Sequence, residues 1–226
     1  MRPVDKGTTP NVYTYYGDAR HDLAGRIGYY CSYCEMGVNN MIEVEHIHPI
    51  ANGGNPLDWN NFLLSCKYCN TVKKANNPSR VNYLWPDIDN TDLAFNYSEV
   101  DVIIPKPTLT APLTAYAEAT INLMGLDRKP GGTNEPTDAD TRWVIKDQAW
   151  SSAKLSYNNW IKLPVQEMAE QIGITSLVGN YSIWREVFKN VPMVLTEIDN
   201  AYLQYGLFKQ YNPGTTVRIV RATGNL

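Results

Sequence analysis

The cysteines place the strongest constraint on this fold, because all four fall in two Cys-x-x-Cys pairs, Cys31/Cys34 and Cys66/Cys69. Each pair can offer two thiolates to one metal ion, and four thiolates suit a structural zinc with closed tetrahedral coordination. Disulfides and a thioredoxin-like redox pair are the alternatives, but the N-terminus lacks the apolar run of a secretory signal. The pattern predicts one zinc site formed by two zinc knuckles, around residues 31–34 and 66–69.

The segment between the knuckles, residues 35–65, is longer than the roughly 15 to 20 residues of common zinc ribbons. Residues 42–47 predict a strand that stops at Pro49, and the Asn-Gly-Gly-Asn sequence at residues 52–55 predicts a turn. Residues 61–65 predict a second strand and residues 69–75 a helix. The expected order is therefore strand, loop, strand and helix, built around the zinc site.

This arrangement resembles the ββα-metal motif of the HNH endonucleases. The resemblance rests on the Glu-His-Ile-His-Pro sequence at residues 45–49, Gly-Gly at 53–54, Asn-Phe-Leu-Leu at 61–64 and Cys-Lys-Tyr-Cys-Asn at 66–70. It implies that His46 is the catalytic base, that Asn61 holds the loop that orients this histidine, and that Glu45 and Asn70 bind a catalytic metal. Glu45 departs from the family, which more often has Asp at that position.

The residue types fit that chemistry, since hydrolysis of a phosphodiester needs a base for the attacking water and positive charge on the phosphate. An imidazole titrates near neutral pH, and the oxygen ligands of Glu45 and Asn70 suit Mg²⁺ or Mn²⁺, whereas the thiolates suit Zn²⁺. The alternative for His46 is an ordinary core or surface histidine. His48 occupies a variable position of the motif and is a candidate for support of the site or for phosphate contact.

Charge argues against a protein that coats nucleic acid by electrostatics alone, because the net charge is −3 and the pI is near 5.6. One run, residues 66–80, carries basic and no acidic side chains. It supplies the candidate phosphate-binding residues Lys67, Lys73, Lys74 and Arg80, for which a plain solvated surface is the alternative.

The second half of the chain changes character after a Pro-, Asn- and acid-rich segment at residues 83–107, which we expect to wrap around the nuclease core and then act as a linker. We expect helices at residues 111–125, 138–163, 164–172, 183–188 and 192–205 and a terminal strand at 216–220. The predicted fold is α+β and mostly α, with an HNH domain at residues 1–106 and a helical, partner-docking domain at 107–226. No stretch reaches the length of a membrane span, so a bacterial cytoplasmic location is expected.

Over the full length, the chain resembles the HNH subunit of bacterial Septu-type and retron-associated anti-phage defence systems, which is encoded beside an ATPase. This resemblance rests on residues 27–35, 57–64, 84–87 and 181–184. It implies a partner ATPase that docks on the second half. The weak basic charge of the chain separately predicts that residues 107–226 dock a larger partner that supplies nucleic-acid affinity, with Trp143, Trp150, Trp160 and Trp184 as buried anchors.

Other readings stay open at this stage. Two alternatives remain for the function: a free-standing phage or mobile-element HNH nuclease, and an inactive zinc-knuckle module that binds nucleic acid. DNA is favoured over RNA as the substrate. A homodimer is a further candidate assembly.

Overall fold

The computed structural model describes all residues except 39, 100–101, 205–219 and 223. A short 3₁₀ turn, η1 (Tyr16–Asp18), leads into helix α1 (Ala19–Ile27). Strands β1 (Ile42–His46) and β2 (Phe62–Cys66) form an antiparallel hairpin whose register pairs Ile42 with Cys66 and His46 with Phe62. Helix α2 (Lys67–Lys73) follows β2 directly, so the predicted strand, loop, strand and helix are all present.

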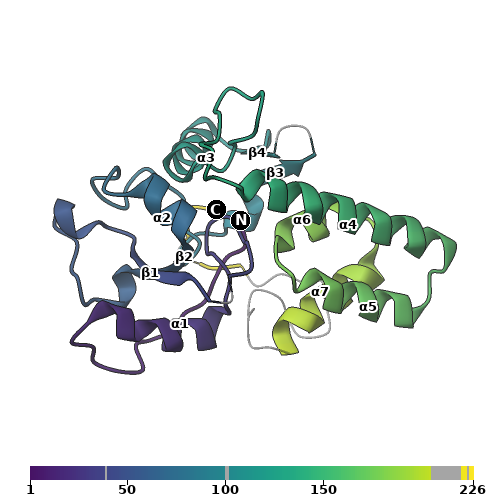
Figure 1. The fold of residues 1–226 in the computed structure, drawn as a ribbon, viewed down its shortest axis with the longest axis horizontal. Helices are drawn as coiled ribbons and strands as arrows, with labels where there is room; N and C mark the ends of the chain where they lie inside the picture. Colours follow the sequence, from purple (N-terminus) through teal and green to yellow (C-terminus); the bar gives the residue numbers. More distant parts are fainter. Residues whose placement is uncertain (39, 100–101, 205–219, 223) are drawn as a thin grey trace.

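The connection between β1 and β2 contains two further 3₁₀ turns, η2 (Ile50–Asn52) and η3 (Trp59–Asn61). Figure 1 shows α1 and α2 on opposite sides of the hairpin, with α3 (Ala111–Met124) beyond α2. Helix α3 has a proline in its first turn and ends at Gly125, which adopts the left-handed conformation that favours glycine.

Residues 83–107 form more than the expected wrapping segment and linker. They contain the 3₁₀ turn η4 (Thr91–Leu93) and a second antiparallel hairpin, β3 (Phe95–Ser98) and β4 (Val102–Pro105). This hairpin contacts α3 through β4 and α6 (Tyr181–Val187) through β3. The sequence prediction missed it because its strands are only a few residues long and lie among prolines and acids.

The remaining helices are α4 (Arg142–Lys162), α5 (Gln166–Ser176) and α7 (Pro192–Gln204), which gather with α6 on one side of the molecule (Figure 1). The predicted end of α5 before Gly173 is wrong, because the helix continues to Ser176. Gly173 is needed there for close packing against α7, since a Cβ atom at this position would lie 2.5 Å from the carbonyl oxygen of Glu197. The predicted strand at residues 216–220 falls almost entirely outside the described residues.

Buried apolar side chains form two clusters. The first extends from Met1 to Leu126 and includes the hairpin, the zinc knuckles and α3, whereas the second extends from Ala153 to Tyr202. Helix α3 therefore packs with the β1–β2 hairpin and the cysteine knuckles although it lies beyond the expected boundary at residue 106. We propose that the boundary between the two halves follows Leu126.

No helix among the described residues has both the length and the apolar character needed to cross a membrane. Among the described residues, helical structure predominates over the two small two-stranded sheets.

Candidate active site

The four cysteines meet in one buried cluster, in which all Sγ atoms lie within 4.8 Å of one another. The Sγ atoms of Cys34 and Cys66 are 3.7 Å apart, close to the roughly 3.8 Å that tetrahedral coordination with Zn–S bonds of about 2.3 Å requires. All four are free thiols rather than disulfides. The donor set fits a structural zinc ion, and within the described residues it is the one cluster of its kind.

The backbone conformation of the two knuckles directs the four thiols toward one point. Glu35 takes a left-handed conformation directly after Cys34, with a φ angle of 63°, and turns the first knuckle back on itself. In the second knuckle, the backbone N–H of Cys69 donates to Sγ of Cys66 at 3.4 Å. Although burial opposes charge, hydrogen bonds from the other three cysteines hold the pKa of Cys31 well below its ordinary value. Hydrogen bonds raise the pKa of Cys66 and burial raises that of Cys69, and zinc binds the thiolate form of a cysteine.

Glu45 lies near the end of β1 and is 2% exposed. One carboxylate oxygen is 2.5 Å from Nζ of Lys73, on α2, and the other accepts a hydrogen bond from the hydroxyl of Tyr33. Burial and the negative charge of Glu45 raise the pKa of Tyr33 well above its ordinary value, so the phenol stays a donor. The oxygen beside Lys73 is in ion-pair contact and has no hydrogen-bond partner among the described residues.

His46, the next residue, faces the other side of the strand, as successive residues of a strand do. Its ring packs edge-on against Tyr16 and Phe62, with centroid distances of 4.8 Å and 5.3 Å. Its Nε2 atom lies 3.1 Å from the carbonyl oxygen of Pro56. Because a carbonyl only accepts, this contact assigns the proton to Nε2 and leaves Nδ1 able to accept a proton.

Asn61 fastens the loop between β1 and η2. Its side chain accepts from the backbone N–H of His48 at 2.7 Å and donates to the carbonyl oxygens of His48 at 2.9 Å and Asn55 at 3.0 Å. Gly54 completes this turn, since a Cβ atom there would lie 1.9 Å from the carbonyl oxygen of His48. The loop that follows His46 is thus held by three hydrogen bonds from one buried amide.

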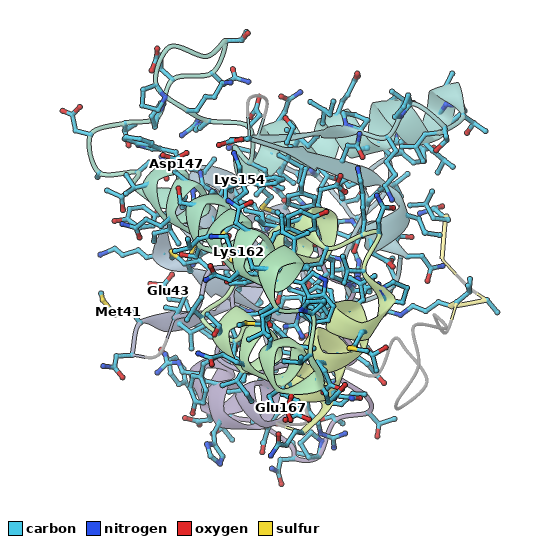
Figure 2. All side chains as sticks on the ribbon, turned by 90° about the vertical axis from the view of Figure 1, so that its right-hand side faces the viewer. Met41, Glu43, Asp147, Lys154, Lys162 and Glu167 are labelled. Atoms are coloured by element: carbon cyan, nitrogen blue, oxygen red, sulfur yellow. The ribbon has the colours of Figure 1, made fainter. Side chains whose placement is uncertain are left out.

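Asn70 and Glu43 form a pair that sequence reasoning did not foresee. Nδ2 of Asn70 donates to Glu43 Oε2 at 2.7 Å, and Glu43 is half-buried on the same side of β1 as Glu45. Figure 2 shows Glu43 near Met41 at the outer edge of the molecule. The sequence did contain a signal for this pair. Side chains two residues apart on a strand share a face, so Glu43 was predictable on the same face as Glu45.

The candidate phosphate-binding residues divide into two groups. Lys67 and Lys74 are exposed, and no ion pair to either is present in the described part of the chain. Lys73 is 1% exposed and neutralises Glu45, so it is not placed to meet a phosphate from solvent. Arg80 is engaged by Asp87 at 2.6 Å, and His48 is half-buried, with an Nε2 atom that has no hydrogen-bond partner among the described residues.

A groove runs along the outer side of α2, with a volume of about 500 Å³. Lys67, on α2, and Lys74, directly after it, line one part of the groove, and Arg128 lines it from the segment between α3 and α4. Asp140, the one acidic residue in this lining, pairs with Arg142 at 2.7 Å and with Arg128 at 3.9 Å, which leaves the two lysines without an acidic partner. The groove is therefore positively charged in a chain whose net charge is negative.

Comparison with known proteins agrees with this geometry over part of the chain. No curated protein matches the sequence. Residues 31–76, from the first cysteine of the cluster to just beyond α2, match the family model of the HNH endonucleases.

Proposed function

We propose that this protein is a metal-dependent endonuclease that hydrolyses phosphodiester bonds in nucleic acid. The observation that carries the proposal is His46, whose Nε2 is held by the carbonyl of Pro56 while Nδ1 can accept a proton. In the reaction, Nδ1 takes a proton from the attacking water, the new P–O bond forms, and the opposite P–O bond breaks. The zinc cluster and Asn61 hold the strand and loop that position this ring.

The residues that would hold a catalytic divalent ion are Glu45 and Asn70, with Glu43 beside them. Their oxygen atoms are the ligands that Mg²⁺ and Mn²⁺ prefer, and such an ion would supply positive charge to the phosphate oxygens. The buried carboxylate of Glu45 already stabilises one cation, the ammonium of Lys73. The ion pair supports a cation site at this carboxylate, one of whose oxygens has no hydrogen-bond partner among the described residues.

The test is cleavage of plasmid DNA, single-stranded DNA and RNA by the full chain, with Mg²⁺, with Mn²⁺ and with EDTA. His46→Ala should lower the rate about 10²- to 10⁴-fold, the usual contribution of general-base catalysis. His21→Ala is the matched control, because His21 is exposed on α1. Wild-type activity in His46→Ala would contradict the mechanism.

One observation favours a second function, a zinc-knuckle module that binds nucleic acid without cutting it. Both oxygens of Glu45 are already engaged, by Lys73 and Tyr33. This alternative predicts that the wild-type protein binds the same substrates but leaves them intact at every metal concentration.

The groove along α2 is the surface we assign to the substrate backbone. Lys67 and Lys74 face Arg128 across it, and each phosphate contact that is lost should reduce the salt dependence of binding by close to one counterion. The triple change Lys67→Ala/Lys74→Ala/Arg128→Ala should therefore flatten the plot of log affinity against log salt. Lys162→Ala is the control, since this lysine is exposed on α4, on the other half of the molecule (Figure 2). An unchanged slope in the triple variant would remove the groove from the binding surface.

We also propose a role as the nuclease of a cytoplasmic anti-phage defence complex with an ATPase partner. The expected tryptophan anchors fit this role poorly, because Trp160 and Trp184 are buried within the helical half itself and Trp143 and Trp150 are half-buried. Exposed apolar side chains in the C-terminal part of α4 are better placed, with Leu155 62% and Ile161 61% exposed.

Co-purification with an ATPase encoded beside the gene tests this role. Leu155→Glu/Ile161→Glu should abolish the complex, whereas Lys162→Ala should preserve it. Complex formation by the double glutamate variant would exclude this surface.

A further inference from the structure

Arg142, the first residue of α4, reaches from the second half of the chain to the zinc cluster. Its Nη1 atom donates to Sγ of Cys69 at 3.1 Å and to the carbonyl oxygen of Met124 at 2.7 Å. The guanidinium is also held by Asp140 through Nε at 2.8 Å and Nη2 at 2.7 Å. With 4% exposure, Arg142 is a buried cation in contact with a zinc-binding sulfur.

Lys146 follows one turn later on α4 and is also buried, with 8% exposure. Its ammonium donates to the carbonyl oxygen of Leu126, and no carboxylate pairs with it in the part of the chain that the structure describes. Burial lowers the pKa of Lys146 below its ordinary value. Residues four apart on a helix share a face, so Lys146 is a second buried cation on the face of α4 that carries Arg142.

The charges of the two groups complement each other. Four thiolates around Zn²⁺ carry a net charge of −2, and a buried charge without a partner is costly in a low-dielectric interior. Arg142 and Lys146 bring two positive charges to this side of the cluster, and Asp140, which pairs with both Arg142 and Arg128, offsets part of them. The direct contact is that of Arg142 with the sulfur of Cys69.

The first knuckle makes a separate link to the helical half. Glu35, which follows Cys34, accepts from the backbone N–H of Ser182 at 2.8 Å and from its hydroxyl at 2.6 Å. The backbone N–H of Asn180 donates to the carbonyl oxygen of Glu35 at 2.9 Å. The second knuckle thus contacts α4 and the first contacts α6. Figure 1 shows both helices on the side of the molecule away from the β1–β2 hairpin.

We propose that the zinc centre joins the two halves of this protein, with Arg142 and Lys146 as positioning residues that neutralise the zinc–thiolate charge. Zinc retention and the docking of α4 are then coupled, so that weakening either one weakens the other. This inference does not depend on nuclease activity, because it concerns only the metal cluster and the helices packed on it.

The first experiment measures the rate at which zinc passes from the full-length protein to a coloured chelator. Arg142→Met should weaken zinc retention about 10- to 100-fold, the usual effect of removing a group that supports a metal ligand. Arg142→Lys, which keeps the charge, should recover part of the loss, and Lys146→Met should lose less than Arg142→Met. The control is Arg185→Met, which breaks a buried arginine–aspartate pair with Asp199 far from the cysteines.

A spectroscopic measurement separates this role from a general loss of stability. In the cobalt-substituted protein, Arg142→Lys should shift the thiolate-to-cobalt charge-transfer band, whereas Arg185→Met should leave it unchanged. Zinc retention at the wild-type rate in a folded Arg142→Met protein would overturn the proposal.

Should Arg142→Met fail to fold, the wild-type protein provides the test. Removal of zinc should increase hydrogen exchange in the first turns of α4 and in α6, while the α5–α7 pair stays protected because it packs within its own cluster. Unchanged protection of α4 after zinc removal would equally contradict the coupling.

Discussion

The zinc cluster and the proposed catalytic centre lie on the same hairpin and helix but are built in opposite ways. The four cysteines converge on one point from two knuckles, and their charge is met by cations from another part of the chain. At the catalytic centre, the key carboxylate of Glu45 is neutralised by a lysine of the adjoining helix. The comparison teaches that the first site gathers four donors around one point, whereas the central carboxylate of the second is held in an ion pair by a neighbouring lysine.

Loss of a zinc ligand should have the largest effect. Cys66→Ser should release zinc and abolish the cooperative unfolding transition, because zinc binding to such sites contributes about 10 kcal/mol or more to folding. Zinc content and thermal unfolding followed by circular dichroism provide the measurement. Ser32→Ala is the matched control within the first knuckle, since its buried hydroxyl has no hydrogen-bond partner among the described residues. A zinc-free but fully folded Cys66→Ser protein would break the comparison.

Removal of the lysine that neutralises Glu45 should come next. Lys73→Met leaves a carboxylate 2% exposed without its cation and should cost about 3 to 5 kcal/mol in the free energy of unfolding. The double variant Lys73→Met/Glu45→Gln should regain much of that loss, because it buries no charge. Urea unfolding measures both, with zinc content as a check that the knuckles are intact. Equal stability of the wild type and Lys73→Met would show that the ion pair is not what stabilises this region.

The smallest effect is expected for the loop that supports His46. Asn61→Ala removes three hydrogen bonds and leaves backbone groups of His48 unpaired, which should cost about 1 to 3 kcal/mol. Cleavage should fall along with the melting temperature, while zinc content stays at one ion per chain. Asn60→Ala, at the exposed neighbouring position, should change neither quantity. Similar behaviour of the two alanine variants would mean that Asn61 does not organise the site.

Local features of this protein were predictable because they depend on residues close together in sequence. The two knuckles follow from cysteine spacing, and the hairpin and α2 follow from apolar alternation, Pro49 and the glycine turn. Helix α3 was predictable within one residue, since its first-turn proline and terminal Gly125 mark both ends. The end of α5 was not predictable, because Gly173 serves a contact with α7 rather than a helix terminus.

The sequence by itself determined which residue types carry chemistry: four thiols for zinc, an imidazole, and oxygen ligands nearby. Only the tertiary structure decided which charges meet. Lys73 lies among basic residues in the sequence and is predicted at the surface. In the structure it is buried against Glu45, which lies on β1, well before Lys73 in the sequence. Arg142 likewise has no local signal that would connect it with Cys69. Such pairs arise because burial makes an unpaired charge costly, and packing of distant elements determines which opposite charge is within reach.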